Sequence, residues 1–496
     1  MTGTSIGMSI DRNRYCLGRG AVVGAAALLT VSLLCLPTSA AETAMWGFTP
    51  GRNMVNDASG LPQTWNVKTG ENILWKAALG SQTYGGPLVV NGQVFVGTNN
   101  QGSRNPRLTG DRGVIMAFSQ EDGSFQWQST HTKLPAGRIH DWPQQGICST
   151  PFVEGDRLYY ISNQCQVVCV DTKGFTDGEN DGLITDEKEN SEIDADVIWT
   201  LDMLNDLDVF PHNLATCSPV GAGDLLFVVT SNGVDEGHVH IPSPFAPSFI
   251  AVNKKTGKVV WEDASPGMGI LHGQWSNPAY GVMGGVPQVV FPGGDGWIYS
   301  LEPETGELIW KFDCNPKDSV WELGGRGTRN NILSTPVIYG DSVYVGVGQD
   351  PEHGEAQGHL YAIDATGKGD VTGTHVVWHV GGKEFNRTMS TAAIDDGLMY
   401  ITDLCGFVYC LDLETGKKYW TYDAFAAIWG SCYVADGMVY IGDEDGDVAI
   451  LKTGKKMELL AEINMGSAIY TTPVGVDGVL YIASRNTLFA IGEGGE

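Results

Sequence analysis

The chain has 496 residues, of which 42% are hydrophobic and 18% are charged, and it contains 66 glycines and 22 prolines. Its formal net charge of −28 at pH 7 repels nucleic acid and anionic lipid surfaces, which excludes nucleic-acid binding as its function. The apolar content is ample for one to three domains with a large core, and the abundant glycine indicates many turns.

Residues 1–41 have the composition of a secretory signal peptide. Three arginines precede an apolar run over 21–36, and small residues of the kind that a signal peptidase recognises follow it. We therefore expect cleavage, export to the periplasm or the extracellular space, and no membrane span after cleavage. An uncleaved anchor is the weaker alternative, because the run is short and rich in Gly and Ala. Lipidation is not expected, because Leu33 and Leu34, rather than small residues, precede Cys35.

The cysteines predict neither a zinc site nor a redox motif. Eight cysteines follow the signal peptide, and no C-x-x-C spacing occurs among them. Export permits disulfides, but a chain of this length does not need them to fold. We expect free or incidentally paired thiols.

A lead-in over 42–72 is followed by one repeated unit that fills residues 73–496. The unit has three recurring features. The first is a proline or small residue eight positions before an aromatic residue: Pro87/Phe95, Pro151/Tyr159, Pro219/Phe227, Pro336/Tyr344, Ala392/Tyr400, Cys432/Tyr440 and Pro473/Tyr481, with a lengthened copy from Pro278. The second is a small residue inside an alternating strand: Ala117, Cys169, Ala251, Ser300, Ala362, Cys410, Ala449 and Ala490. The third is a tryptophan that ends a short apolar run: Trp75, Trp127, Trp199, Trp261, Trp310, Trp378 and Trp420, with Leu460 in its place once.

Each unit predicts a sheet of four short strands. The turns “NKKTGK”, “EPETGE” and “DLETGK” separate the third strand from the fourth, and their glycine supplies the positive φ that a hairpin needs. A four-stranded sheet whose tryptophan packs on the neighbouring sheet is a propeller blade. Burying one indole stabilises the fold by about 5 kcal/mol before entropy is charged, so these tryptophans are structural.

The count of units predicts an all-β fold, an eight-bladed β-propeller. The first tryptophan strand, over 73–76, comes before the first proline start, and the last unit has no tryptophan strand after it. The simplest closure therefore gives the last blade its outer strand from the N-terminal side of the chain.

The units “YAIDATGK…VVW” and “YCLDLETGKKYW” resemble the tryptophan-docking repeats of the pyrroloquinoline-quinone (PQQ) type propellers. That group includes quinoprotein alcohol dehydrogenases and the non-enzymatic BamB-like outer-membrane assembly proteins. The resemblance covers residues 62–493 and implies the fold. It leaves open an enzymatic or a non-enzymatic function, because this fold hosts both.

In such a propeller two kinds of connection emerge on one face around the central axis: from the fourth strand to the next blade, and from the second strand to the third. We call this the axial face. The candidate ligand-binding residues fall on it: His212, His272, Gln274, Trp275, Arg326, Arg329, Asn330, Asp350, His353 and Arg387. Polar side chains on long loops of a rigid scaffold are typical of a binding site. The alternative for each histidine is a solvated or hydrogen-bonded role.

Three of these groups suggest particular ligands. Trp275 lies outside the tryptophan column and could stack on a planar ligand. Arg326 and Arg329 favour an anionic ligand, such as the carboxylates of a quinone cofactor, or else pair with neighbouring acids such as Glu322. His353 lies among carboxylates that could hold a metal, and His238 and His240 alternate as in a strand, although solvated loops explain both patterns.

An acidic insertion over 172–196 lies on the opposite face. Asp177, Glu179 and Asp181 follow the opening of an EF-hand calcium loop, but Lys188 stands where the loop needs a bidentate glutamate. The insertion is a candidate for weak calcium binding, and a solvated acidic loop is the equal alternative.

The resemblance makes two demands that the chain does not meet. Quinoprotein dehydrogenases hold PQQ between a tryptophan and two adjacent cysteines beside a Ca²⁺ ion, and this chain has no adjacent cysteine pair. BamB-like proteins are lipoproteins with modest loops. We therefore expect an exported binding or scaffolding module whose axial face takes a protein partner or a small anionic ligand. The alternative is an atypical quinoprotein oxidoreductase with PQQ and calcium as its cofactors.

Overall fold

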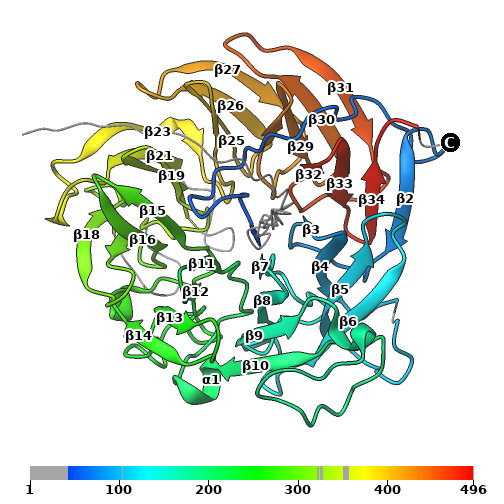
Figure 1. Cartoon of the computed structure of the whole chain (residues 1–496). Helices are drawn as coiled ribbons and strands as arrows, with labels where there is room; N and C mark the ends of the chain where they lie inside the picture. The colour runs from blue at the N-terminus through cyan, green and yellow to red at the C-terminus, as the bar shows by residue number, and fades with distance from the viewer. Residues whose placement is uncertain (1–42, 103, 321–322, 324–327, 350–356, 495–496) are drawn as a thin grey trace, which may run out of the picture. The chain divides into compact units, whose positions relative to one another are not determined.

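The computed structural model describes residues 43–102, 104–320, 323, 328–349 and 357–494. This part of the chain forms eight antiparallel sheets that follow one another around a common axis, which confirms the predicted eight-bladed β-propeller (Figure 1). In each blade the first strand is innermost and the fourth outermost. Helical structure in the described chain is limited to single turns: η1 (Gly137–Ile139), η2 (Gly174–Asp177), α1 (Met203–Asp206) and η3 (Gly267–Gly269).

The strands of each blade are given from the inner to the outer strand. Blade 1 consists of β3 (Leu88–Val90), β4 (Gln93–Asn99), β5 (Arg112–Ser119) and β6 (Phe125–Thr132), and blade 2 of β7 (Phe152–Glu154), β8 (Arg157–Ser162), β9 (Gln166–Asp171) and β10 (Val197–Asp202). Blade 3 consists of β11 (Val220–Ala222), β12 (Leu225–Val229), β13 (Phe249–Asn253) and β14 (Val259–Asp263), and blade 4 of β15 (Ala279–Met283), β16 (Val286–Pro292), β17 (Trp297–Leu301) and β18 (Leu308–Asp313). Two short strands extend these sheets: β1 (Thr43–Ala44) beside β7 and β22 (Gly369–Asp370) beside β18.

Blade 5 consists of β19 (Val337–Tyr339), β20 (Ser342–Val347), β21 (Gln357–Asp364) and β23 (Val376–Asn386), and blade 6 of β24 (Ala393–Asp395), β25 (Leu398–Thr402), β26 (Phe407–Asp412) and β27 (Lys418–Asp423). Blade 7 consists of β28 (Tyr433–Ala435), β29 (Met438–Gly442), β30 (Asp447–Lys452) and β31 (Leu459–Asn464), and blade 8 of β32 (Val474–Val476), β33 (Val479–Ala483), β34 (Thr487–Ile491) and β2 (Ile73–Ala78). The pairing of β2 with β34 confirms the predicted closure of the ring.

The tryptophan column joins each blade to the next. Trp127, for example, lies opposite the small residue Ala117 on the third strand of its own blade, and a register shift follows the pair. Its Nε1 donates a hydrogen bond of 2.9 Å to the carbonyl of Thr172 in the next blade. Trp75, Trp199, Trp261, Trp378 and Trp420 donate to carbonyls of the following blade in the same way.

Trp310 makes the same junction through a side chain. Its Nε1 donates to Oε1 of Gln288 at 2.7 Å, and Nε2 of Gln288 donates to the carbonyl of Ala365 in the next blade at 3.1 Å. The amide therefore relays the hydrogen bond that the other indoles make directly.

The seventh blade departs from the predicted pattern by one residue. Because Tyr440 pairs with Ile450 and Ile450 with Ala461, the second and third columns pass through Ile450 and Ala461, and the assignments to Ala449 and Leu460 were wrong. The large and small positions are exchanged in this blade. The eighth blade takes its fourth strand from β2, so it has no hairpin on which an indole could dock. Trp65 of the lead-in packs in the cluster that contains Ile450 instead.

The lead-in runs along the first strands of the blades. The carbonyl of Pro50 accepts from the backbone N–H of Tyr280 in blade 4, that of Gly51 accepts from Ile338 in blade 5, and Val55 pairs with Val434 in blade 7. In Figure 1 this dark-blue segment passes close to the inner strands before it reaches β2.

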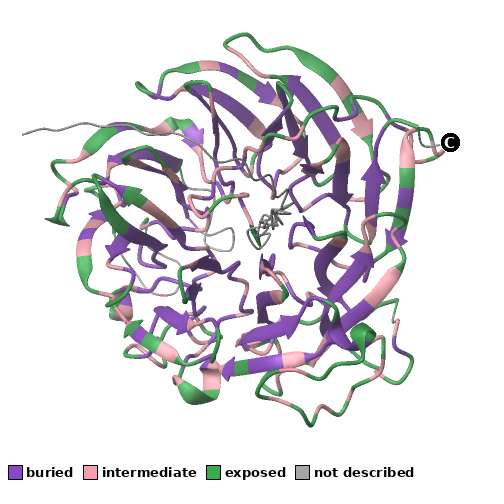
Figure 2. Cartoon of the chain, in the orientation of Figure 1, coloured by how far each residue is buried: buried purple, intermediate pink, exposed green. Residues whose placement is uncertain are grey.

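The core lies within and between the blades, where the second and third strands are almost entirely buried, whereas exposed residues gather on outer strands and loops (Figure 2). The buried thiols of Cys165, Cys169, Cys217, Cys314, Cys410 and Cys432 are free. Among the described residues, no helix has the length and apolarity needed to cross a membrane.

Candidate functional site

A cavity of about 480 Å³ opens where the connections between blades meet around the axis. Each of the eight connections contributes the residue three positions before its proline-type start. These residues are Tyr84, Cys148, Thr216, Trp275, Leu333, Met389, Trp429 and Tyr470. All eight are half-buried, so together they form a ring of mostly apolar side chains that we call the cavity ring.

A second, mostly buried layer lies two residues further along each connection. Polar groups here bond from blade to blade: the N–H of Thr150 donates to Oγ of Ser218 at 2.9 Å, and the N–H of Ser218 donates to Oδ1 of Asn277 at 2.5 Å. Nδ2 of Asn277 donates to Oγ1 of Thr335 at 2.8 Å. Because these groups satisfy one another, the layer holds the cavity ring in place.

Aromatic contacts order one side of the cavity ring. The rings of Tyr84 and Tyr470 stack with their centroids 4.9 Å apart, and Trp429 meets Tyr470 edge-on at 6.1 Å. Burial raises the pKa of Tyr84 to about 12 and that of the Cys148 thiol to about 12, so both groups are neutral at physiological pH. Among the described lining residues, Glu444 is the one acidic side chain, and none is basic.

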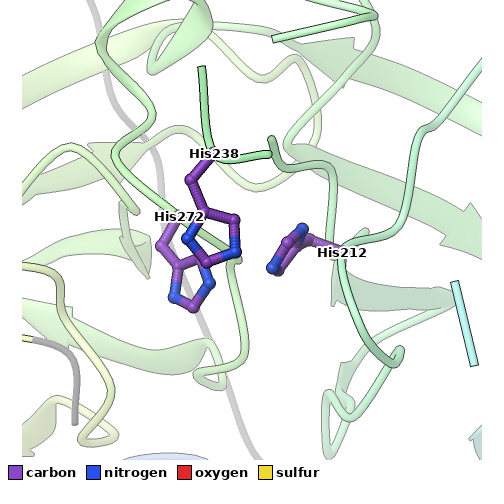
Figure 3. A group of neighbouring side chains, drawn as sticks. All are labelled: His212, His238 and His272. Carbon is purple, nitrogen blue, oxygen red and sulfur yellow. The ribbon is translucent and has the colours of Figure 1, made fainter. Parts of the chain in front are cut away.

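Three histidines lie together, and their side chains point toward one another (Figure 3). His212 follows α1, His238 lies between β12 and β13, and His272 lies between β14 and β15. Their ligand nitrogens are all within 4.8 Å of one another. His212 and His272 are buried, and His238 is half-buried.

Backbone hydrogen bonds bring these three loops together. The N–H of His212 donates to the carbonyl of Ser231, and the N–H of Val234 donates to the carbonyl of His272 at 3.2 Å. Gly233 lies between them, and a Cβ there would stand 2.6 Å from Cβ of His212 and 2.8 Å from the carbonyl oxygen of His272. Only glycine allows this close approach.

Trp275 links the histidines to the cavity. Its Nε1 donates to the carbonyls of His212 at 3.0 Å and Leu214 at 3.1 Å. Its ring centroid is 4.9 Å from that of His272 and 6.0 Å from that of His212. One indole therefore contacts the histidine cluster and lines the cavity.

Gln274, Asn330, Arg329 and Arg387, the other described candidates outside the histidine cluster, are not among the residues that line the cavity. Gln274 is buried, and its side chain bonds to the carbonyl of Asn232, to Ser248 and to the N–H of Gly294. Asn330 bonds within its own loop through Nδ2 to the carbonyl of Cys314.

The two described arginines among the candidates lie in neighbouring connections. Nη2 of Arg329 lies 3.5 Å from Oδ2 of Asp313, which is the acid pairing considered as the alternative to ligand binding. Arg387 lies in the connection that leads into blade 6, and its carbonyl accepts from Leu404. Arg326, Asp350 and His353 lie outside the described residues.

The acidic insertion engages basic side chains of its own region. Oδ2 of Asp181 lies 3.3 Å from Nη2 of Arg157, and Oδ2 of Asp177 lies 3.7 Å from Nζ of Lys173. Within the described residues, the group of metal-ligating side chains that converges is the histidine cluster and not Asp177, Glu179 and Asp181.

The eight-membered cavity ring was not predicted, although the sequence carries a signal for it. Counting back three residues from each proline-type start gives six apolar or aromatic residues, one cysteine and one threonine. Of these eight residues, Trp275 alone was predicted to bind a ligand. The reason was that it does not belong to the recurring tryptophan column. His238 was considered with His240 as an alternating pair, whereas its neighbours in space are His212 and His272.

Comparison with known proteins shows the fold. A family described as outer membrane protein assembly factor BamB matches residues 38–142 and 356–457, which is less than half of the chain. BamB from Moraxella catarrhalis is 14% identical, with a TM-score of 0.50 over 84% of this chain and 96% of that chain. Quinohemoprotein alcohol dehydrogenase from Comamonas testosteroni is 13% identical, with a TM-score of 0.60 over 91% of this chain and 80% of that chain. No curated protein matches the sequence. These findings confirm the propeller fold and the predicted resemblance to PQQ-type and BamB-like propellers.

The described cavity does not fit PQQ. PQQ is a carboxylate-bearing quinone, and its anionic groups need arginine or lysine partners. Among the described lining residues there is neither arginine nor lysine, and Glu444 adds a negative charge. Cys148 lines the cavity without an adjacent second cysteine.

Proposed function

We propose that the protein is an exported binding module that engages a partner protein through its axial face and takes up an apolar side chain of that partner in the axial cavity. The observation that carries this proposal is the chemistry of the cavity ring, in which Trp275, Trp429, Tyr84 and Tyr470 are joined by Leu333 and Met389. An apolar anchor in an aromatic-lined pocket is the usual centre of a protein interface.

Exposed hydrophobic residues on the same face support a protein as the partner. Phe245, between β12 and β13, and Phe425, between β27 and β28, are each 89% exposed. Val239 and Met268, on neighbouring axial-face loops, are also exposed. Large apolar side chains held in water on one face are typical of an interaction surface.

The comparisons support the same class of function. The family that matches part of the chain is described as an outer membrane protein assembly factor, and a factor that assembles other proteins contacts them. BamB from Moraxella catarrhalis and this chain share the propeller fold. The leader over 1–41 supports export, and the formal net charge of −28 supports solubility in the exported compartment.

A peptide-selection experiment tests the proposal. Random peptides displayed on phage are selected on the purified protein, and the affinities of the enriched peptides are measured by calorimetry. Leu333→Trp adds an indole to the cavity ring, so we expect it to weaken these peptides at least tenfold. Leu183→Trp is the matched control, because it adds the same indole to an exposed site in the acidic insertion. Enriched peptides without an apolar residue, or equal affinity for the Leu333→Trp variant, would contradict the proposal.

The alternative, a quinoprotein oxidoreductase, predicts a different result. PQQ at micromolar concentration, with and without Ca²⁺, is titrated against tryptophan fluorescence, and dye reduction is followed with alcohols, aldose sugars and aldehydes. Saturable binding with turnover would establish the enzyme and overturn the binding module. We expect neither, because the described lining lacks cationic groups.

A further inference from the structure

The histidine cluster has the composition of a transition-metal site. Three imidazoles from three separate loops converge, with ring centroids 4.4 Å apart for His212 and His272, 4.5 Å for His238 and His272, and 4.9 Å for His212 and His238. Imidazole nitrogens suit zinc, copper, nickel and iron, whereas calcium and magnesium prefer oxygen ligands. The donor set therefore selects a late first-row ion.

One ligand is already oriented as metal sites require. Nδ1 of His212 lies 2.8 Å from the carbonyl oxygen of Val234. A carbonyl can only accept, so Nδ1 carries the proton and the lone pair of the neutral ring lies on Nε2. Metal-bound histidines are commonly fixed by such a bond from the second ring nitrogen to a backbone carbonyl.

The spacing is close to that of a loaded site. Zn–N bonds of about 2.0–2.1 Å at tetrahedral angles place the ligand nitrogens roughly 3.3 Å apart. The three nitrogens now lie within 4.8 Å, so a small inward movement completes the set. His238 can make that movement, because it is half-buried on the loop between β12 and β13, whereas His212 and His272 are buried.

The loop that carries His238 is held in shape by an acidic residue. The N–H of His238 donates to the carbonyl of Asp235, and Oδ1 of Asp235 accepts from the N–H groups of Val239 and His240. His238 has a positive φ of 56°, which this turn imposes. The carboxylate of Asp235 also brings negative charge close to the site, which favours a divalent cation.

We propose that His212, His238 and His272 form a Zn²⁺ site that ties the loop between β12 and β13 to the wall of the axial cavity through Trp275. Three protein ligands leave the fourth tetrahedral position to a water molecule or an anion. Because Trp275 bonds to the carbonyl of His212 and packs against His272, the metal stiffens one segment of the cavity ring. The Zn²⁺ site goes beyond the proposed binding function, because its three ligands lie outside the cavity ring and only Trp275 belongs to both.

Metal binding is measured directly on the whole protein. After removal of metals with a chelator, the protein is titrated with Zn²⁺ by calorimetry and with Co²⁺ by visible absorption, which reports tetrahedral coordination. We expect one equivalent of each ion, displacement of Co²⁺ by Zn²⁺, a rise in Tm with Zn²⁺, and no binding of Ca²⁺ at the same site.

Variants assign the site. His238→Ala removes the half-buried ligand, and we expect it to weaken Zn²⁺ at least a hundredfold and to abolish the tetrahedral Co²⁺ spectrum. His240→Ala is the matched control, because His240 is exposed two residues away, and we expect an affinity within about twofold of the original. Since His212 and His272 are buried, their alanine variants are read only where circular dichroism shows a native sheet. Less than one equivalent of Zn²⁺, unchanged affinity in His238→Ala or an equal loss in His240→Ala would overturn the proposal.

The two proposals fail separately. Leu333→Trp blocks the cavity and leaves the three histidines intact, so it retains Zn²⁺ binding. If Leu333→Trp loses peptide binding and keeps normal Zn²⁺ binding, the result supports the binding function and the Zn²⁺ site. If the protein binds Zn²⁺ but no peptide can be selected on it, the result contradicts the binding function alone.

Discussion

Nε of Arg52 donates a hydrogen bond of 2.7 Å to the carbonyl of Pro278, which joins the lead-in to the start of blade 4 across 226 residues. The same guanidinium donates to the carbonyls of Ser218 at 2.7 Å and Trp46 at 2.8 Å. The side chain is fully buried, and burial lowers its pKa to about 9. Arg52 therefore joins the lead-in to the starts of blades 3 and 4, and one of its partners, Ser218, lines the cavity.

Replacing Arg52 with methionine should weaken the fold strongly. The substitution keeps an unbranched apolar stem and leaves three carbonyls without their donor, and each unsatisfied buried group costs about 1–3 kcal/mol. We expect a loss of roughly 3 kcal/mol in the free energy of unfolding, measured by urea titration. Lys68→Met, at an exposed position of the same lead-in, is the control and should change stability by less than about 0.5 kcal/mol. Equal effects of the two variants would show that the Arg52 bonds are not needed.

The docking of an indole on the next hairpin is tested by two glycines of blade 6. Gly416 has a φ of 69°, and a Cβ there would stand 2.7 Å from the Trp378 ring; Gly397 has a φ of 73° and open space around it. Gly397→Ala should cost about 1–2 kcal/mol for its backbone conformation alone. Gly416→Ala should cost about 1–3 kcal/mol more, because the indole must move. Thermal unfolding of both variants measures the difference, and equal losses would argue against tight docking.

The relay through Gln288 predicts a coupled effect. Gln288→Leu leaves Nε1–H of Trp310 and the carbonyl of Ala365 unsatisfied in the core, so we expect a loss of about 2–4 kcal/mol in the free energy of unfolding. In Trp310→Phe the indole donor is already absent, and Gln288→Leu should then cost at least 1 kcal/mol less. A double-mutant cycle from urea titrations measures this coupling. Additive losses would mean that the two side chains act independently.

The pH dependence of stability should carry a contribution from Asp295. This carboxyl is buried and accepts from the hydroxyl of Tyr299 at 2.6 Å, and burial raises its pKa from 3.8 to about 6. The folded protein therefore holds a proton that the unfolded chain releases between these pH values, and the stability that this proton contributes is lost as pH rises from about 4 to about 6. We expect the difference in free energy of unfolding between the wild type and Asp295→Asn to fall by about 2–3 kcal/mol over this range.

A second variant checks the assignment of that slope. The Tyr299 hydrogen bond favours the charged carboxylate, so Tyr299→Phe should move the window to higher pH. Urea titrations at intervals of half a pH unit resolve the shift. A difference between the wild type and Asp295→Asn that stays constant from pH 4 to 7 would rule out the titration of Asp295.

The fold was predictable because its determinants recur. Trp127 and Trp420 appear in the sequence at the end of similar apolar runs, and the local pattern dictates the same hairpin each time. The prediction failed by one residue in blade 7, where Ile450 and Ala461 reverse the usual large and small positions. That reversal depends on the missing hairpin of the next blade, which is a relationship between the two ends of the chain and not a local signal.

The candidate site was only partly predictable, because convergence around an axis is a property of the closed ring. His212 and His272 were singled out as residues of one face, but their approach to His238 depends on Gly233 and on the hydrogen bond between Val234 and His272. For the arginines the sequence left two roles open, an anionic ligand or a neighbouring acid, and Arg329 lies beside Asp313. In a chain rich in carboxylates, sequence alone does not tell which acid an arginine meets.

The pairing of β2 with β34 sets an order of events. Whichever way the chain emerges, from a ribosome or through a membrane pore, Ile73–Ala78 appears first and its partner Thr487–Ile491 appears last. At about 5–20 residues per second, β2 waits on the order of half a minute or more with an unpaired edge. The ring therefore closes in one late step. Until that step, the unpaired edge of β2 is open to pairing with strands of other unfolded or aggregating chains in place of β34.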